Sequence, residues 1–325
     1  MLFEQGILTG VRGVCLYPTP STICFSQAET LSQQETTAIV TSPDGQILAS
    51  SHGKKIQLWN LRTGKPLALL AGHSGWVSAM TFSPDNKTLA SASFDRTIRL
   101  WNLDTGKLFS TFVAGRMTDL AFSPDGQILA GSSRYQLWLD GQPGSSGVKL
   151  WDLKTGQQLR PLSLGSLTAL AFSPTGQVIA TGGSATQLWD WKTRRLLHTL
   201  NSGQVTNLAF SRDGQMLVSG SSKIKVWQIS TGELIHTLKS GSSDLALSSD
   251  GQTLAVASGG IVELWRVETG KLLGALRGSK YSNLHIAFGL NGQVIISGAS
   301  DGIEIWRAEW KKGVILYPQM PDSAP

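Results

Sequence analysis

The residues of this chain that could perform chemistry are five histidines, aspartates placed in turns, and many glycine- and serine-containing stretches. Metal binding or acid–base catalysis requires such side chains to converge on one point. The histidines instead fall in different strand contexts along the chain: His52, His73, His198, His236 and His285. The sequence contains no GxxxxGK[ST] phosphate loop and no G-x-S-x-G elbow between a strand and a helix. We therefore predict no catalytic residue, no metal site and no cofactor, and hence no enzyme.

The composition narrows the class of protein further. Hydrophobic residues make up 41% of the 325-residue chain and charged residues 15%, which is typical of a folded globular protein. The formal charge of +6 comes from scattered basic residues rather than from a basic stripe with interleaved aromatics, so we expect no nucleic-acid partner. Two cysteines and no apolar run of membrane-spanning length predict a cytoplasmic protein without a membrane span.

Repeats are the elements that must position any functional side chain. Tryptophans recur at separations of 42, 50, 38, 38, 38 and 41 residues and define seven units; they are Trp59, Trp101, Trp151, Trp189, Trp227, Trp265 and Trp306. In each unit an alternating segment such as 77–82 runs into SPDG or a variant of it, which predicts a strand and a tight turn. Two further strands lead to the tryptophan, and a fourth follows a turn that is Thr-Gly in five units.

Four antiparallel strands per unit leave apolar residues on both faces of each small sheet. Neighbouring sheets must therefore pack face to face, and seven of them can close into a ring. The chain thus predicts an all-β fold, a seven-bladed β-propeller of four-stranded antiparallel blades.

The residues also resemble a known family, the WD-repeat β-propellers, over about residues 23–310. The second unit carries the full signature, with Gly72-His73, SPDNKTLASAS, Asp95 and Trp101-Asn102. The resemblance implies a structural hydrogen-bond network that joins His73, a hydroxyl of Ser91 or Ser93, Asp95 and Trp101. The other units lack the histidine, so we expect them to depend more on apolar packing.

The family resemblance also implies that an N-terminal strand completes the last blade and closes the ring. The segment Glu29–Gly45 aligns without gaps on His198–Gly214, which places a closing strand at about 23–31. We therefore divide the chain into an N-terminal extension, 1–22, a single propeller, 23–310, and a C-terminal extension, 311–325. A rival closing segment is 313–318, which nearly repeats 13–18; we favour the N-terminal strand, with these two segments close together outside the ring.

Blade three departs from the repeat. Phe122 and Trp151 lie 29 residues apart, whereas the same interval is 19 residues in the second unit and 17 in the fourth and fifth. The insertion carries Tyr135 and Trp138, and we expect it to form a hairpin on the face of the inter-blade loops. Its Trp138 either contacts a partner or folds back onto its own blade as a lid, and the sequence leaves both alternatives open.

A second departure is a set of positions, six residues before the first-strand Phe or its equivalent, at which no single residue type predominates: Glu35, Trp76, Arg116, Ser166, Gln204, Gly241 and Ser282. Repeats keep structural positions alike, so this variety indicates positions freed from the fold. Among them, Trp76 and Arg116 flank the insertion and are our candidates for partner binding, together with Tyr135 and Trp138.

These features predict a non-enzymatic scaffold that binds another protein, of unknown identity, through its upper face and the blade-three hairpin. One alternative is a small-ligand binder or enzyme that works in the central channel. Another is a structural subunit of a larger assembly.

Overall fold

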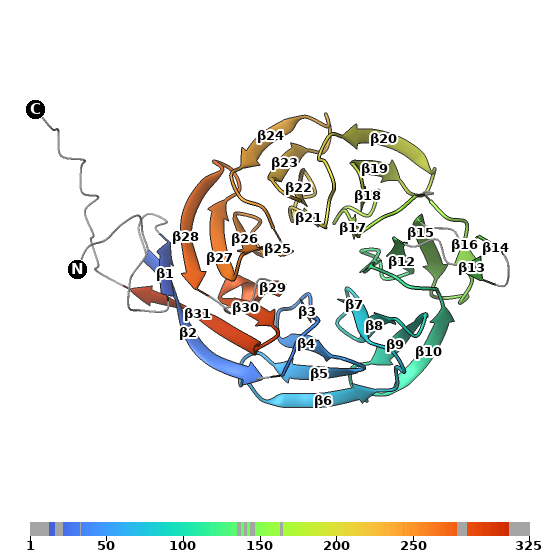
Figure 1. The fold of residues 1–325 in the computed structure, drawn as a ribbon, viewed down its shortest axis with the longest axis horizontal. Helices are drawn as coiled ribbons and strands as arrows, with labels where there is room; N and C mark the ends of the chain where they lie inside the picture. The colour runs from blue at the N-terminus through green and yellow to red at the C-terminus, as the bar shows by residue number, and fades with distance from the viewer. Residues whose placement is uncertain are drawn as a thin grey trace, which may run out of the picture.

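The structure is a computed structural model that describes residues 13–16, 22–32, 34–134, 138–139, 142–143, 147–162, 165–242, 244–277 and 285–311. Within these ranges the chain is almost entirely strand and turn, with one short 3-10 helix, η1 (Leu290–Gly292). Figure 1 shows the sheets arranged as blades around a common centre. Seven sheets of four or five strands follow one another in chain order, which confirms the predicted seven-bladed propeller.

The blades have the following strands. Blade one contains β3 (Ala38–Thr41), β4 (Ile47–His52), β5 (Lys55–Asn60) and β6 (Pro66–Ala71). Blade two contains β7 (Val77–Phe82), β8 (Thr88–Ser93), β9 (Thr97–Asn102) and β10 (Leu108–Val113). Blade three contains β11 (Asp119–Phe122), β12 (Ile128–Ser133), β15 (Gly147–Asp152) and β16 (Gln158–Leu159), and its insertion holds β13 (Trp138–Leu139) and β14 (Gln142–Pro143).

Blade four contains β17 (Ala169–Phe172), β18 (Val178–Gly182), β19 (Thr186–Asp190) and β20 (Arg195–Leu200). Blade five contains β21 (Asn207–Phe210), β22 (Met216–Gly220), β23 (Ile224–Gln228) and β24 (Leu234–Leu238). Blade six contains β25 (Asp244–Leu247), β26 (Thr253–Ser258), β27 (Ile261–Arg266) and β28 (Lys271–Arg277). Blade seven contains β29 (His285–Gly289), β30 (Val294–Ala299), β31 (Gly302–Lys311), β2 (Thr22–Ser32) and β1 (Gly13–Leu16).

Turn chemistry on one face, which we call the lower face, explains why the SPDG sequence recurs. In blade two the Ser83 hydroxyl donates to Asp85 Oδ1 (2.5 Å) and accepts from the Thr88 N–H (2.9 Å), so one side chain closes the turn on both sides. The same pair of bonds forms in the turns that begin at Ser42, Ser123, Ser211 and Ser248. The hydrogen bond from Ser83 lowers the pKa of Asp85, which therefore remains an acceptor in the folded protein.

The residue after the tryptophan caps the second lower-face turn. Asp152 Oδ1 accepts from the backbone N–H groups of Lys154 (2.9 Å) and Thr155 (2.8 Å). Asp190 makes the equivalent pair of bonds in blade four, and the amide oxygens of Asn60 and Asn102 also accept N–H groups of the turns that follow them. A short side chain with an oxygen two or three bonds from the backbone satisfies this geometry, so Asn replaces Asp without loss of the turn.

Ring closure uses the N-terminal strand. β2 pairs antiparallel with β31 and supplies the outer strand of blade seven, one residue longer at each end than the strand expected at 23–31. β1 adds a further strand outside β2, away from the ring centre (Figure 1). Hydrogen bonds join this blade to blade one, for example from Thr41 Oγ1 to the Phe288 carbonyl (2.8 Å) and from the Leu290 N–H to the Gly45 carbonyl (2.9 Å). The rival segment, 313–318, lies outside the described residues.

The hydrophobic core lies between blades rather than within them. Ile56 and Leu58 of blade one pack in one cluster with Phe82 and Trp101 of blade two. The same arrangement recurs around the ring as far as the seam, where blade seven packs against blade one. Each blade therefore buries its apolar side chains only against its neighbours, and the closed ring stabilises what one blade could not.

A buried polar network crosses blade two. His73 Nδ1 lies 2.8 Å from Asp95 Oδ2, and His73 Nε2 lies 2.8 Å from Ser91 Oγ. The Trp101 Nε1–H donates to the same Ser91 oxygen at 2.8 Å. Of the two predicted hydroxyl alternatives, Ser91 thus lies between His73 and Trp101, while Ser93 Oγ accepts from the Asp95 N–H (3.1 Å). Burial lowers the pKa of His73, whereas hydrogen bonds from Thr97, His73 and Ser74 outweigh burial and lower the pKa of Asp95.

Other blades keep the tryptophan half of this network. Trp59, Trp189, Trp227 and Trp306 each donate Nε1–H to a second-strand hydroxyl: Ser50, Thr181, Ser219 and Ser297. Blade one adds a histidine from a different place, since His52 Nε2 lies 3.0 Å from Ser50 Oγ and its Nδ1 lies 3.0 Å from the Glu35 carbonyl. Sequence reasoning missed His52 because it sought the histidine only in the Gly-His position.

Two aspartates join the innermost strands of adjacent blades. Asp119 Oδ2 accepts from the Leu170 N–H of blade four (2.9 Å), and Asp244 Oδ2 accepts from the Ile286 N–H of blade seven (3.1 Å). Each also accepts its own neighbour's N–H, from Leu120 and Leu245. Burial raises the pKa of Asp119 to about 7, although the two N–H donors favour its charged form.

The blade-two network predicts a large effect of removing its histidine. His73→Ala removes one hydrogen-bond partner from Ser91 Oγ and one from Asp95 Oδ2, so we expect the free energy of unfolding to fall by about 1–3 kcal/mol. Urea unfolding at neutral pH measures this change. The matched control is His198→Ala on the outer strand β20, where the side chain is only partly buried and a change within about 0.5 kcal/mol is expected. Equal losses in the two variants would contradict a role for the network.

Asp119 predicts a pH dependence. The unfolded chain releases this proton near the ordinary pKa of 3.8, whereas the folded protein holds it to about pH 7. Folding therefore binds a proton between these values, and the Asp119 contribution to stability falls as the pH rises through them, by roughly 1.4 kcal/mol for each unit of pKa difference.

Asp119→Asn removes this titration. The stability of the variant relative to the wild-type protein should rise between pH 5 and pH 7.5, measured by urea unfolding, because all other titrating groups are common to both proteins. The exposed Asp104→Asn is the control and should give a constant difference. Parallel curves for wild type and Asp119→Asn would refute the assignment.

Candidate interaction surface

The face opposite the SPDG turns, which we call the upper face, carries two of the predicted partner-binding residues, Trp76 and Arg116. An exposed phenylalanine, Phe94, lies with them. Trp76 and Phe94 are 49% and 51% exposed, and the guanidinium carbon of Arg116 lies 5.3 Å from the centre of the Phe94 ring. We call Trp76, Phe94 and Arg116 the upper-face cluster. Phe94 was missed in the sequence, although a phenylalanine in a turn between strands is a signal: the corresponding turns of blades one and six are Gly53-Lys54 and Gly259-Gly260.

The loops that carry Trp76 and Phe94 are fixed to each other. The Phe94 N–H donates to the Trp76 carbonyl at 2.8 Å, and the Ser74 N–H donates to Asp95 Oδ2 at 3.0 Å. Gly75 lies so close to the neighbouring turn that a Cβ there would stand 2.5 Å from the Asp95 nitrogen. The His73–Asp95 pair lies directly beneath, so the aromatic side chains project from a backbone that the blade-two network holds in place.

Arg116 is held by backbone contacts on both sides. The N–H groups of Ala114 and Gly115 donate to the Arg96 carbonyl of blade two, at 3.0 and 3.1 Å. On the other side the Arg116 carbonyl accepts from Ser133 Oγ (3.1 Å), at the base of the blade-three insertion. Its side chain remains exposed above these contacts.

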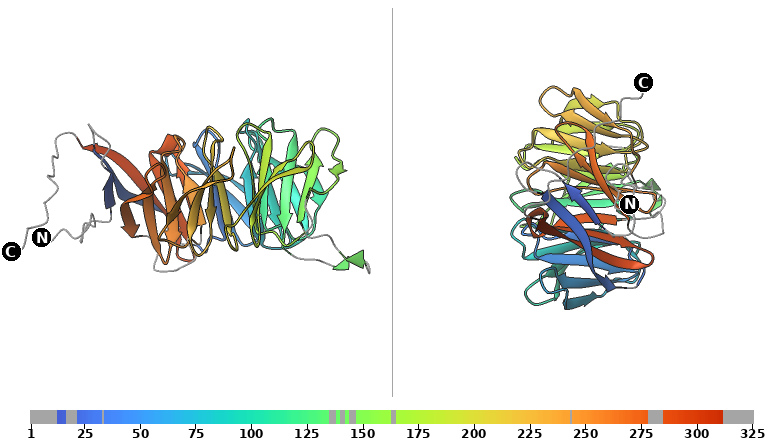
Figure 2. Two further views of the ribbon diagram at one scale, coloured as in Figure 1. Left: turned by 90° about the horizontal axis from the view of Figure 1, so that it is seen from above. Right: turned by 90° about the vertical axis from the view of Figure 1, so that its left-hand side faces the viewer.

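The blade-three insertion leaves the ring beside this cluster. Its base contacts the next inter-blade loop, since Ser166 Oγ donates to the Arg134 carbonyl (3.0 Å) and the Leu167 N–H to the Ser133 carbonyl (3.2 Å). β13 and β14 pair antiparallel, and Figure 2 shows this hairpin standing clear of the disc on the side opposite β1. Tyr135 lies outside the described residues, and of Trp138 the structure describes the backbone in β13.

The variable positions of the repeat lie on this same face. Glu35, Trp76, Arg116, Ser166 and Gln204 are exposed, Gly241 is half-buried, and Ser282 lies outside the described residues. Their exposure agrees with side chains that take no part in packing the blades.

On the inner strands, polar side chains from three blades meet, which the sequence did not predict. Asp244 Oδ1 accepts from Asn207 Nδ2 (2.9 Å), and His285 Nδ1 lies 3.5 Å from Asp244 Oδ2. One column of the repeat contains these residues: Ala38, Ala79, Asp119, Ala169, Asn207, Asp244 and His285. Comparison of that column would have found them. Both Asp244 oxygens already accept backbone N–H groups, so the carboxylate joins blades, and among the described residues no metal-binding group of three His, Cys, Asp or Glu side chains occurs.

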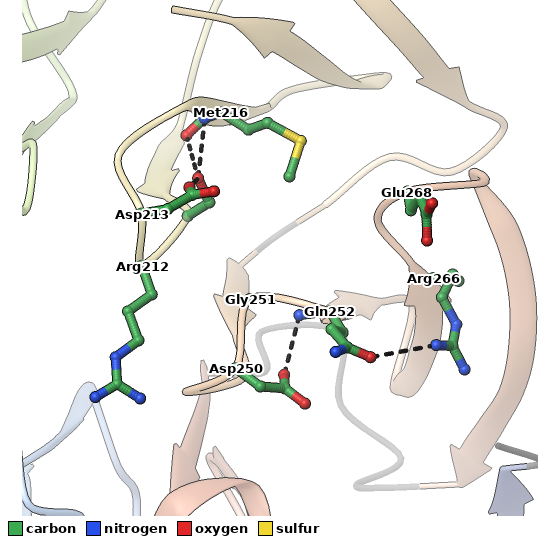
Figure 3. A pocket seen from close by; sticks show the side chains of 9 residues that line it. Arg212, Asp213, Met216, Asp250, Gly251, Gln252, Arg266 and Glu268 are labelled. Carbon is green, nitrogen blue, oxygen red and sulfur yellow. Dashed lines mark hydrogen bonds between the residues drawn. The ribbon is translucent and has the colours of Figure 1, made fainter.

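The lower face has a hollow of about 460 Å³ between blades five and six (Figure 3). Arg212 and Arg266 lie on opposite sides of it, and each contacts a group of the wall, the Ser249 carbonyl (3.4 Å) and Gln252 Oε1 (3.4 Å). Asp213, Asp250 and Glu268 also line it, so charges of both signs alternate without a common focus. Blades one to four have a proline at the turn position that Arg212 occupies in blade five. The hollow lies beside the turn that lacks this proline.

Comparisons with known proteins agree with this architecture. The repeat model described as WD domain, G-beta repeat matches residues 26–60, 64–102, 157–190 and 194–228. No helix in the described part of the chain is long and apolar enough to cross a membrane.

Curated relatives match parts of the chain. Pre-mRNA-processing factor 19 of Oryza sativa subsp. japonica is 35% identical over 83 residues, which cover 25% of this chain and 16% of that protein. The periodic tryptophan protein 2 homolog of Schizosaccharomyces pombe is 31% identical over 120 residues, 34% of this chain and 13% of the relative. An uncharacterized WD repeat-containing protein of Synechocystis is 31% identical over 114 residues, 34% of this chain and 32% of the relative.

This chain therefore spans a third or less of the length of each of these three relatives. Each matched range begins at or near the outer strand of one blade and ends at the third strand of the next, and these third strands belong to blades one, two, four and five. The four matched repeats, in a ring of seven blades, show that the chain belongs to the WD-repeat β-propeller family.

Proposed function

We propose that the protein is a non-enzymatic scaffold that binds a protein partner through its upper face, at the upper-face cluster and the blade-three hairpin. The observation that carries this proposal is a pair of half-exposed aromatic side chains, Trp76 and Phe94, on loops that are fixed to each other. Trp, Tyr and Arg are the residues that dominate binding energy in protein interfaces. Fixed loops also reduce the conformational entropy that binding would otherwise remove.

The polar groups of the protein support a role without catalysis. His73 and Asp95 bind each other and the backbone of blade two, while Asp119 and Asp244 join inner strands of neighbouring blades. These side chains therefore already have structural partners, and the channel alternative has no free nucleophile or base among them. We place the protein in the cytoplasm, and we expect a protein rather than a nucleic acid as its partner.

A second candidate function is a structural subunit of a larger assembly, and the outer strands favour it. Five outer strands expose large apolar side chains: Leu67 and Leu69, Leu108 and Phe109, Leu196 and Leu197, Leu234 and Ile235, and Leu272. Several relatives carry names of processing or assembly factors, such as ribosome assembly protein 4 of Saccharomyces cerevisiae, which fits the same candidate. Contacts around the circumference would then add to those of the upper face.

Replacement of Trp76 separates these two functions. We expect Trp76→Ala to reduce recovery of the partner, in native affinity purification followed by mass spectrometry, by roughly tenfold or more because it removes a central aromatic contact. The temperature of thermal unfolding should stay unchanged, since the side chain is 49% exposed. Phe109→Ala, at a 58% exposed aromatic of β10, is the matched control. Loss with Phe109→Ala but not with Trp76→Ala would assign binding to the outer strands.

Trp138→Ala distinguishes the two roles predicted for the hairpin. A partner contact predicts weaker recovery with an unchanged unfolding temperature, because an exposed side chain contributes little to folding. A lid predicts a lower unfolding temperature with recovery retained. Unchanged recovery in this variant would remove the hairpin from the proposed binding surface.

A further inference from the structure

Basic side chains surround the upper-face cluster in three dimensions, although they are scattered in the sequence. Four of them are exposed on the upper loops of blades one to three: Lys54, Arg96, Arg116 and Arg134. Backbone hydrogen bonds connect their loops in series. The Val77 N–H donates to the Gly53 carbonyl beside Lys54 (2.8 Å), and the Gly115 N–H donates to the Arg96 carbonyl (3.1 Å). The cations therefore lie along one continuous rim around Trp76 and Phe94.

The acidic groups described on the same loops are two, Asp95 and Glu35, against four basic side chains, so the rim keeps an excess of positive charge. Asp95 is bound internally through both oxygens, Oδ2 by His73 Nδ1 and the Ser74 N–H, and Oδ1 by the Thr97 N–H and hydroxyl. Glu35 is exposed and belongs to the blade-one end of the rim. The surface next to the aromatic pair is thus cationic.

Arg116 combines the positive charge of this surface with a contact to one of its aromatic rings. Its guanidinium makes a cation–π contact with the Phe94 ring, and a guanidinium in such a contact still has N–H groups that can bind a carboxylate. An acidic group bound there would lie next to an apolar group packed on Phe94.

From this geometry we propose that the upper-face cluster recognises a linear peptide segment in which an acidic residue stands next to an aromatic or large aliphatic residue. The inference rests on the proposed protein-binding function and adds the chemistry of the partner. Arg116 binds the carboxylate, Trp76 and Phe94 pack against the apolar side chain, and Lys54, Arg96 and Arg134 attract the segment through the field of the rim.

A single-stranded nucleic acid would use the same kinds of residue differently. It requires successive aromatic faces on which bases stack along a basic groove. Here the Arg116 guanidinium already contacts the Phe94 ring, and Trp76 is the other aromatic side chain of the cluster. This arrangement favours a peptide side chain over a run of stacked bases.

Selection from a random-sequence peptide library displayed on phage, with the full chain as bait, tests the proposal. We expect enriched peptides to place Asp or Glu within a few positions of Phe, Trp or Leu. For one synthetic enriched peptide, Arg116→Glu should weaken binding by about tenfold or more in fluorescence anisotropy, and replacing the peptide's acidic residue by Lys should restore binding to that variant. Arg195→Glu, an equal charge change at the exposed start of β20, should leave the affinity unchanged.

The other outcomes overturn the proposal in distinguishable ways. Peptides that bind in a Trp76-dependent manner without an acidic preference would refute the inference and leave the proposed function standing. Equal losses with Arg116→Glu and Arg195→Glu would assign the effect to net charge and refute it as well. A labelled oligouridylate that competes with the peptide and needs Trp76 and Arg116 would assign the surface to RNA. If selection yields only peptides indifferent to Trp76→Ala, both the inference and the proposed function fail.

Discussion

Packing between neighbouring blades is the constraint on which the rest of the structure depends. The apolar clusters take their members from two adjacent blades, as Ile56 and Phe82 illustrate, so no blade can be stable alone. An open end would expose one such face, and β2 prevents this by completing the sheet that packs against blades six and one. Because the core is shared in this way, the sequence of the strands is constrained while the loops above them are free to vary in sequence.

Much of the fold follows from local chemistry, and this is why the sequence predicts it. The SPDG turn needs only the Ser and Asp side chains of the turn itself, and the capping residue after each tryptophan acts on the next three residues. Strand alternation is equally local. Seven blades and the closing strand near 23–31 could therefore be read from the chain, and the structure confirms both.

The contents of the site could not be read in the same way, because they depend on which loops the ring brings together. Trp76 and Arg116 were identified by their variability, but Phe94 joins them through contacts between different turns. Asp244, Asn207 and His285 belong to three blades and meet only when adjacent inner strands align. Likewise, the spread of basic residues along the sequence concealed that Lys54, Arg96, Arg116 and Arg134 share one rim.

The signature residues of blade two connect the fold to the proposed function. His73 and Asp95 do no chemistry of their own, yet Asp95 binds the Ser74 N–H and so fixes the loop that presents Trp76, while Gly75 permits the close approach of the Phe94 turn. The complete Gly-His network lies in the blade whose loops carry both exposed aromatics. In blade one, His52 binds the Glu35 carbonyl and holds a loop that carries no aromatic side chain. The blade-two network and the fixed backbone of the proposed binding surface therefore depend on the same hydrogen bonds, and a backbone that is already fixed loses less conformational entropy when a partner binds.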